Sequence, residues 1–280
     1  MIELQLKRVS HDRRTGSECE YIEPNVTESC LLKDGEETVG VYLSDVSKHD
    51  EKLVKIMSVA NAEFRSQRVP KTLMERADVL QAIKAGMTRA EAQQIGTAQY
   101  STILGSVPPN AIMRRNYRNR SSVHLKATAK PFVKAMLMAA ERLDSLMAEL
   151  LPSLHVQHLE AMSQVDEQWR FGNLFTSSIS NFNIAAPFHR DRANIRQTLN
   201  AIYTMRENAV GGCLYVPDYD ACFEMPSHSL LFYPAWRNTH AVTPIQTTHD
   251  SGYRNSLVWY ALQAFVGDEH DNEQGRKAQD

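Results

Sequence analysis

The 280-residue sequence contains no apolar run of the roughly 18 consecutive residues that a membrane helix needs. Its first seven residues lack the apolar core and cleavage site of a secretory signal. Only four cysteines are present, Cys19, Cys30, Cys213 and Cys222, and none belongs to a Cys-x-x-Cys pair. We therefore expect reduced thiols, no membrane association and a cytoplasmic location, or a nuclear one if the source is eukaryotic.

Several common catalytic signatures are also missing. The chain has no P-loop, no Gly-x-Gly-x-x-Gly and no Gly-x-Ser-x-Gly, so it lacks the usual marks of phosphate-binding loops, dinucleotide-binding folds and α/β-hydrolases. Apolar residues make up 42% and charged residues 23%, which is typical of a folded globular protein rather than a disordered one. The net charge of -2 does not by itself favour any class of partner.

The pattern of apolar residues changes near residue 166. Before it, apolar residues recur mainly at helical spacing, in 53–60, 73–83, 88–94 and 131–150, with strands expected at 2–6 and 39–43. After it, short apolar or alternating runs lie between turn residues, at 171–179, 199–205, 212–216, 229–233, 240–245 and 256–265. We predict an α+β protein with a mixed helical region at 1–165, a jelly-roll core at 166–266 braced by the helices, and a polar tail at 267–280.

Three side chains in the second half form a candidate metal site. His189 and Asp191 would point to the same face of a strand, and His240 begins a later run that a rolled sheet could bring beside them. Two imidazoles and one carboxylate can occupy three adjacent positions on divalent iron and leave three open. Zinc accepts the same donors. A His-x-Asp triplet alone is frequent by chance and is often only a surface pair, so the metal interpretation depends on the residues that follow.

Downstream of His240, an arginine and a hydroxyl share one strand face. Arg254 and Ser256 are two residues apart, so the guanidinium could bind a carboxylate bidentately while the hydroxyl adds a hydrogen bond. The alternative is an ordinary exposed strand arginine. Together with the three possible metal ligands, this pair favours a site for an iron and a dicarboxylate.

These residues resemble the iron and 2-oxoglutarate signature of the double-stranded β-helix dioxygenases. The sequence Gly-Gly-Cys-Leu-Tyr-Val-Pro at 211–217 is similar to the turn after the first ligands, and His-Ala-Val-Thr-Pro at 240–244 is similar to the run at the distal histidine. Within that superfamily, the set is most similar to the TET and J-base-binding-protein branch, over about residues 170–265. The chain lacks the cysteine-rich zinc region of the animal enzymes, which favours a compact bacterial or phage type.

The resemblance implies a cupin-like double-stranded β-helix and a 2-oxoglutarate-dependent dioxygenase. It implies Fe(II) held by the catalytic ligands His189, Asp191 and His240, with O2 and with 2-oxoglutarate bound by Arg254 and Ser256. The expected reaction is hydroxylation of the methyl group of 5-methylcytosine or thymine in DNA. The alternatives are a hydroxylase of a small molecule, amino acid or peptide, and a non-catalytic jelly-roll binding module. No protein partner is implied.

Further candidate residues concern the substrate. No acidic residue occurs between Glu91 and Glu141, and this stretch has a cluster of cations with one tyrosine, including Arg114, Arg115, Tyr117 and Arg118. Such a segment can contact phosphates and stack on a base. Its ordinary interpretation is a solvated loop whose arginines pair with acids elsewhere. Phe188 and Trp236, close in sequence to the ligands, are candidate pocket walls, although such rings more often belong to the core.

Overall fold

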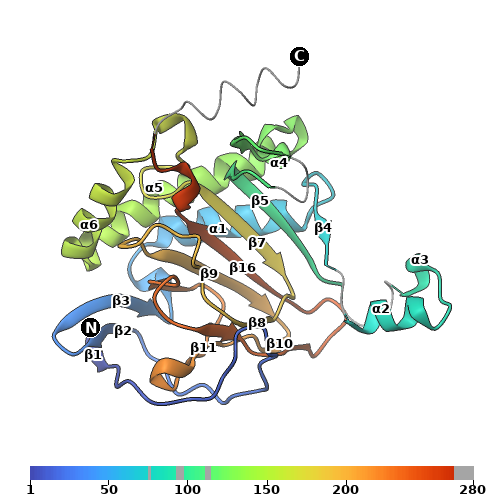
Figure 1. The fold of residues 1–280 in the computed structure, drawn as a ribbon, viewed down its shortest axis with the longest axis horizontal. Coiled ribbons are helices and arrows are strands. Elements are labelled where there is room, and N and C mark those ends of the chain that lie inside the picture. Colours follow the sequence, from blue (N-terminus) through green and yellow to red (C-terminus); the bar gives the residue numbers. More distant parts are fainter. Residues whose placement is uncertain (75–76, 93–97, 111–114, 268–280) are drawn as a thin grey trace.

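A computed structural model describes residues 1–74, 77–92, 98–110 and 115–267 (Figure 1). Among these residues the largest element is a ten-stranded sheet, in which β6 (Asn119–Arg120) pairs with β5 off the main path. The main path runs in the order β1 (Ile2–Gln5), β2 (Cys30–Asp34), β3 (Glu37–Leu43), β13 (Ser229–Tyr233), β9 (Asn200–Glu207), β16 (Tyr253–Tyr260), β7 (Ser177–Phe182), β5 (Tyr100–Val107) and β4 (Thr72–Leu73).

A smaller sheet packs against one face of the large one. Its order is β12 (Ala221–Phe223), β11 (Leu214–Val216), β14 (His240–Val242) and β8 (Ala186–His189), and β10 (Ala209–Gly211) pairs with β15 (Ile245–Thr247) beside it. Leu214, Val216 and Phe223 of the smaller sheet belong to one buried cluster with Ile202 and Leu231 of the larger sheet. This shared core holds the two sheets together as a jelly roll.

Helices cover the opposite face of the large sheet (Figure 1). The long ones are α1 (Glu51–Arg65), α5 (Lys130–Leu150) and α6 (Pro152–Met162), and the short ones are α2 (Ala77–Lys84), α3 (Arg89–Ala92) and α4 (Ser122–Leu125). Short 3-10 turns lie at Val46–Lys48, Ala127–Ala129, Glu167–Trp169, Pro217–Tyr219 and Gln263–Phe265.

Side-chain spacing explains the helix layer. The buried residues of α5 include Phe132, Met136 and Leu143, at successive spacings of four and seven positions, which place them on one face of the helix. They belong to the same core cluster as Leu257 and Trp259 of β16. The Asp50 side chain accepts the Leu53 backbone N–H at the start of α1 and pairs with Arg142 of α5 at 2.8 Å. The helices thus support the strand that also carries Arg254.

The predicted α+β jelly roll braced by helices is confirmed, with some differences in detail. Helix α6, which was not predicted, begins at Pro152 directly after α5, because proline is well tolerated in a first helical turn. The large sheet draws β1–β6 from the N-terminal region, and β2, β4, β5 and β6 were not predicted. The proposed boundary at residue 165 remains a prediction, and most of the predicted tail, 268–280, lies outside the described residues.

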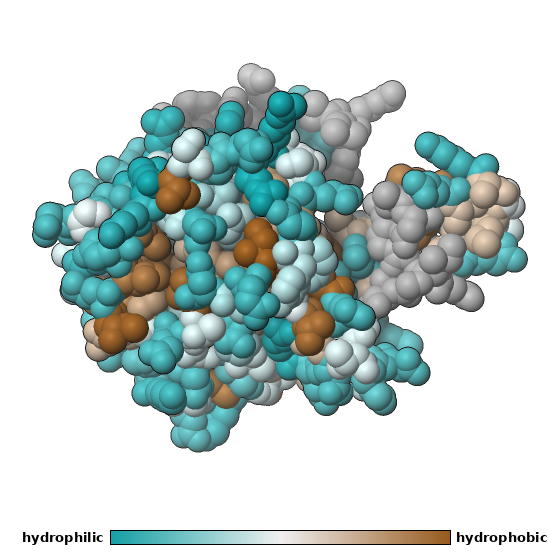
Figure 2. All heavy atoms as spheres, turned by 90° about the horizontal axis from the view of Figure 1, so that it is seen from below, coloured by the Kyte–Doolittle hydropathy of each residue, from teal (hydrophilic) through white to brown (hydrophobic). Residues whose placement is uncertain are grey.

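The face shown in Figure 2 is mainly hydrophilic and carries scattered apolar side chains, and α2 and α3 project from the body of the protein (Figures 1 and 2). Among the described helices, none is both long enough and apolar enough to cross a membrane. All four cysteines are buried and free.

Candidate metal centre

The three predicted metal ligands come together between two strands of the smaller sheet. His240 of β14 and His189 of β8 are cross-strand partners, and their ring centroids lie 4.3 Å apart. Strand β8 ends at His189, so Asp191 projects from the following loop rather than from the strand as predicted. One ligand atom from each of the three residues lies within 4.8 Å of the others. The sequence prediction that these side chains converge is therefore correct.

Backbone carbonyls orient both imidazoles. The Nδ1 of His189 lies 2.7 Å from the carbonyl oxygen of Pro187, and the Nδ1 of His240 lies 3.2 Å from that of Asn238. Because a carbonyl oxygen only accepts, Nδ1 carries the proton in each ring, which leaves Nε2 as the electron-pair donor. The Nε2 of His189 lies 3.5 Å from Asp191 Oδ1. Both donor atoms therefore suit a metal ion next to the carboxylate.

Two asparagines, which sequence reasoning missed, position the carboxylate of Asp191. Asn200 of β9 donates from Nδ2 to Asp191 Oδ2 at 2.9 Å, and Asn194 donates to the Asn200 side-chain oxygen at 2.7 Å. The Asp191 backbone N–H donates to the carbonyl oxygen of Ala235. One oxygen of Asp191 is thus held by the large sheet, while the other faces the imidazoles. No sequence motif marks Asn200, because it lies nine residues from Asp191 on another strand.

The electrostatics also favour a metal. Burial, and secondly the neighbouring His189, lower the pKa of His240 to about 4. The ring is therefore neutral at neutral pH and can donate to a cation. Two imidazoles and one carboxylate match the donor set that holds non-haem Fe(II). These residues fit such an ion.

Arg254 lies on β16 and is fully buried. Its backbone is fixed by Asn183, whose side chain accepts the Arg254 N–H at 2.7 Å. Burial lowers the pKa of Arg254 to about 10, so the guanidinium stays protonated at neutral pH. Its Nε has no hydrogen-bond partner among the described residues. A buried, charged and unsatisfied donor of this kind fits an anionic ligand.

A turn of two glycines leaves room for this guanidinium. Gly211 and Gly212 have φ values of +71° and +67°, which favour glycine. A Cβ at Gly212 would lie 3.0 Å from Arg254 Nε, and a Cβ at Gly211 would lie 1.9 Å from the Pro244 carbonyl oxygen. The pair therefore lets the chain enter β11 close to the arginine without a clash.

A row of hydroxyls crosses three strands beside Arg254. Ser256 of β16 is the register partner of Thr204 in β9, and Thr204 is the partner of Ser229 in β13. The Thr204 and Ser229 hydroxyls are buried and have no hydrogen-bond partner among the described residues. Three hydroxyls next to a buried guanidinium fit the carboxylate of a dicarboxylic acid such as 2-oxoglutarate. Sequence reasoning found Ser256 but missed Thr204 and Ser229, because only strand pairing brings them together.

A hollow opens directly beside Asp191. Its wall includes Ile179 of β7, Val258 and Tyr260 of the adjacent strand β16, and Leu262 just after that strand. Burial, and secondly the charge of Asp191, hold the pKa of the Tyr260 hydroxyl above its ordinary value, so it stays protonated. The hollow thus combines apolar surface with a neutral hydroxyl next to the metal ligands.

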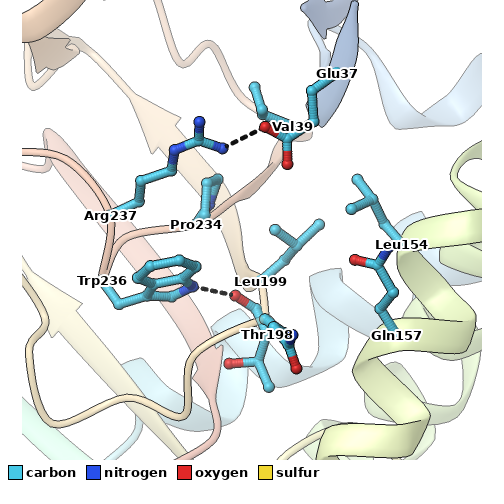
Figure 3. A pocket seen from close by; sticks show the side chains of 10 residues that line it. Glu37, Val39, Leu154, Gln157, Thr198, Leu199, Pro234, Trp236 and Arg237 are labelled. Carbon is cyan, nitrogen blue, oxygen red and sulfur yellow. Dashed lines mark hydrogen bonds and ion pairs between the residues drawn. The ribbon is translucent and has the colours of Figure 1, made fainter. Parts of the chain in front are cut away.

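The two predicted pocket walls lie in different surroundings. Trp236 lines two hollows near Asp191, and its indole N–H donates to the Thr198 carbonyl oxygen at 3.0 Å (Figure 3). Phe188 is fully buried in a cluster with Cys213 and Tyr215, and it supports from behind the strand that carries His189. A substrate contact remains a prediction for both rings.

The predicted basic segment is largely tied to the protein's own backbone. Arg115 donates to the Pro108 carbonyl oxygen, and Arg118 donates to the carbonyl oxygens of Val266 and Gly267. Tyr117 is partly exposed and has further contacts of its own. Arg114 lies outside the described residues. A role of this segment in substrate binding stays a prediction.

Comparison with known families agrees with this site. The profile of the Tet/JBP family, the oxygenase domain of the 2OGFeDO superfamily, matches residues 111–263, which is more than half of the chain. The matched span contains the three candidate metal ligands as well as Arg254 and Ser256. Among curated protein sequences, no match was found.

One solved structure shows the same fold, and two others align less well. NgTET1 in complex with 5mC DNA aligns with a TM-score of 0.59 and 14% identity, over 96% of this chain and 90% of that chain. A 2OG-Fe(II) oxygenase-family oxidoreductase from Burkholderia pseudomallei aligns with a TM-score of 0.39 and 11% identity, over 73% of this chain and 88% of that chain. A prolyl-4-hydroxylase from Pseudomonas putida aligns with a TM-score of 0.29 and 12% identity, over 73% of this chain and 97% of that chain. The likeness to NgTET1 supports the jelly-roll assignment.

Proposed function

The chain belongs to the Tet/JBP family of 2-oxoglutarate- and iron-dependent oxygenases, and from this premise we propose that it hydroxylates the methyl group of a 5-methylpyrimidine in DNA. The substrate base is 5-methylcytosine or thymine. The observation that carries the proposal is the convergence of His189, Asp191 and His240 next to an apolar hollow. The family match and the TET–DNA neighbour support a nucleic-acid substrate.

In this proposal each site residue has one task. His189, Asp191 and His240 would hold Fe(II), which with 2-oxoglutarate and O2 supplies the oxidation of a C–H bond. Arg254 would bind the distal carboxylate of 2-oxoglutarate, and Ser256 would add a hydrogen bond.

The hollow beside Asp191 would receive the base. A base in duplex DNA is stacked and paired, so it would have to leave the helix to reach this hollow. Ile179 and Val258 would exclude water from the methyl group, and the neutral Tyr260 hydroxyl could donate to a polar edge of the base. The protein thereby places an unreactive methyl group next to the metal ligands.

The test is product analysis on DNA. Purified protein loaded with Fe(II) is incubated with 2-oxoglutarate and duplexes that contain 5-methylcytosine or thymine, and the digested nucleosides are measured by mass spectrometry. We expect a gain of 16 Da on one methylated base with matched release of succinate, and neither signal in the Asp191→Asn variant. Unchanged DNA together with steady 2-oxoglutarate consumption would favour the alternative, a hydroxylase of a small molecule, amino acid or peptide.

A further inference from the structure

Three exposed arginines lie on the loop that carries Asp191. They are Arg190, Arg192 and Arg196, between β8 and β9. The Nε of Arg190 donates to the Thr239 hydroxyl at 3.1 Å. No ion pair links any of the three to an acidic side chain in the part of the chain that the structure describes. Three positive charges are thus concentrated beside the metal ligands without internal neutralisation.

The same arginines line three adjoining hollows. The first contains Asp191 with Arg190 and Arg192, the second is bordered by Arg190, Arg192 and Arg196, and the third by Arg192 and Arg196. Because successive hollows share arginines, they lie side by side, beginning at Asp191; we call this set of hollows the arginine groove. Among the described residues, Asp191 is the only acidic one that lines it.

The loop backbone that displays these arginines is firmly held. The Ile195 N–H donates to the Ala261 carbonyl oxygen at 2.9 Å, and the Gln263 N–H donates to that of Ala193 at 2.8 Å. The Ile195 side chain is buried in a small apolar cluster with Ala261 and Phe265. The guanidinium groups therefore extend from a fixed backbone, which lowers the entropic cost of binding a partner.

The groove differs from the basic segment predicted from sequence. The guanidinium groups of Arg115, Arg118 and Arg120 donate to backbone carbonyl oxygens, whereas the side chains of Arg192 and Arg196 have no internal hydrogen bond among the described residues. Free guanidinium groups bind phosphate bidentately. A groove several hollows long suits a chain of phosphates better than one small anion.

We propose that the arginine groove binds the phosphate backbone of the DNA strand whose target base enters the hollow beside Asp191. This inference depends on the proposed DNA substrate and identifies the surface that holds it. Arg190 and Arg192 contact the strand next to the target nucleotide, and Arg196 contacts it farther along. Trp236, which also lines the second hollow, forms its apolar wall.

The test compares salt dependence of binding. A fluorescently labelled 5-methylcytosine duplex is titrated with metal-free protein at several salt concentrations. The Arg192→Gln/Arg196→Gln variant should bind at least about tenfold more weakly, and the slope of log K against log salt should fall by about 1.8, because each lost phosphate contact contributes about 0.9. Arg192→Lys/Arg196→Lys should keep most of the slope, since the charges remain.

The control removes the same charge elsewhere. Lys48 and Lys52 are exposed, in the 3-10 turn Val46–Lys48 and in α1, outside both the groove and the basic stretch predicted from sequence. Lys48→Gln/Lys52→Gln should leave the affinity and slope near those of the wild type, and thermal unfolding checks that both double variants fold. An equal loss of DNA affinity in this control would contradict the proposed role of the groove. So would an unchanged affinity in the groove variant while the wild type binds DNA. If the wild-type protein shows no salt-dependent DNA binding, the proposal that DNA is the substrate fails instead.

Discussion

At the scale of single residues, the proposed metal site depends on side chains that are not candidate ligands. Asp191 Oδ2 accepts a hydrogen bond from Asn200, so the carboxylate cannot rotate freely and presents its other oxygen to the imidazoles. Partners of this kind fix ligand orientation and raise metal affinity. Thr204 and Ser229 have a comparable place beside Arg254, where their hydroxyls border the position expected for a dicarboxylate.

The Asn200→Ala substitution tests this support. We expect metal affinity to fall by roughly 10- to 100-fold, because Asp191 loses the bond that fixes it. Anaerobic titration with Fe(II) or Mn(II) measures the change. The matched control is Asn173→Ala, since Asn173 is exposed and donates to Asp144 away from the site. Equal metal affinity in the Asn200 variant and the wild type would show that the hydrogen bond from Asn200 is not needed to orient the Asp191 carboxylate.

Arg254 carries the second residue-scale prediction. Arg254→Gln removes the buried charge, so binding of 2-oxoglutarate should weaken by about 10- to 100-fold, the value of a hydrogen bond to a charged group. Ser256→Ala should cost less, because one neutral hydroxyl is lost. Calorimetric titration of metal-loaded protein with 2-oxoglutarate gives both values. If Arg254→Gln binds the co-substrate like the wild type, another residue holds the distal carboxylate.

At the scale of elements, the turn before β11 decides how closely two strands approach. Gly211 lies opposite the Pro244 carbonyl oxygen, and Gly211 is also the register partner of Ile245. The following Gly212 donates its backbone N–H to the same carbonyl oxygen. This tight pairing places the segment that follows His240 and β14 next to the segment that leads into β11.

Two glycine substitutions separate strain from contact. Gly35 and Gly211 both have positive φ, but a Cβ at Gly35 would meet nothing within 4 Å. Gly35→Ala should therefore cost about 1 kcal/mol of unfolding free energy, from backbone strain alone. Gly211→Ala should cost on the order of 3 kcal/mol, because the Pro244 backbone must also move. Denaturant unfolding measures both, and similar losses would mean that the turn relaxes easily.

At the scale of the whole molecule, buried histidines link stability to pH. His158 is fully buried on α6; its Nε2 donates to the Leu174 carbonyl oxygen, and its Nδ1 accepts the Leu199 N–H. Burial lowers the pKa of His158 to about 4. In the unfolded chain an exposed histidine has a pKa near 6.5. Between about pH 6.5 and 4, therefore, the unfolded state binds a proton at this histidine and the folded state does not.

The sign of this linkage gives a prediction. The unfolding free energy should fall as pH drops from about 6.5 to about 4, and His158 alone contributes up to about 3 kcal/mol of the loss. The His158→Asn variant should have a lower unfolding free energy at pH 7, but its unfolding free energy should fall less between these pH values. Denaturant unfolding of metal-free protein gives the slopes. Leu143→Ala, a buried substitution on α5, should lower stability while keeping the wild-type slope; an equally steep slope in His158→Asn would contradict the linkage.

Much of this architecture was predictable because local patterns are strong where one face is buried. The apolar spacing of 131–150 corresponds closely to α5, and 229–233 corresponds to β13. Strand β5 was missed because its pattern of buried and exposed residues does not alternate regularly. The strand expected to carry both His189 and Asp191 is β8, but it has only four residues and ends at His189.

Residue types alone indicated the chemistry: two histidines, one carboxylate and one downstream arginine, in an order that suits iron and a dicarboxylate. Which other side chains lie beside them became evident only from strand pairing. Asn200, Thr204 and Ser229 are separated along the chain, and strand register places them beside Asp191 or Arg254. The arginine groove likewise depends on which cations lack an internal partner. The type of a residue decides which ligand its side chain can bind. Which side chains lie next to each other, and which charges are neutralised by a partner, depends on how distant strands pair.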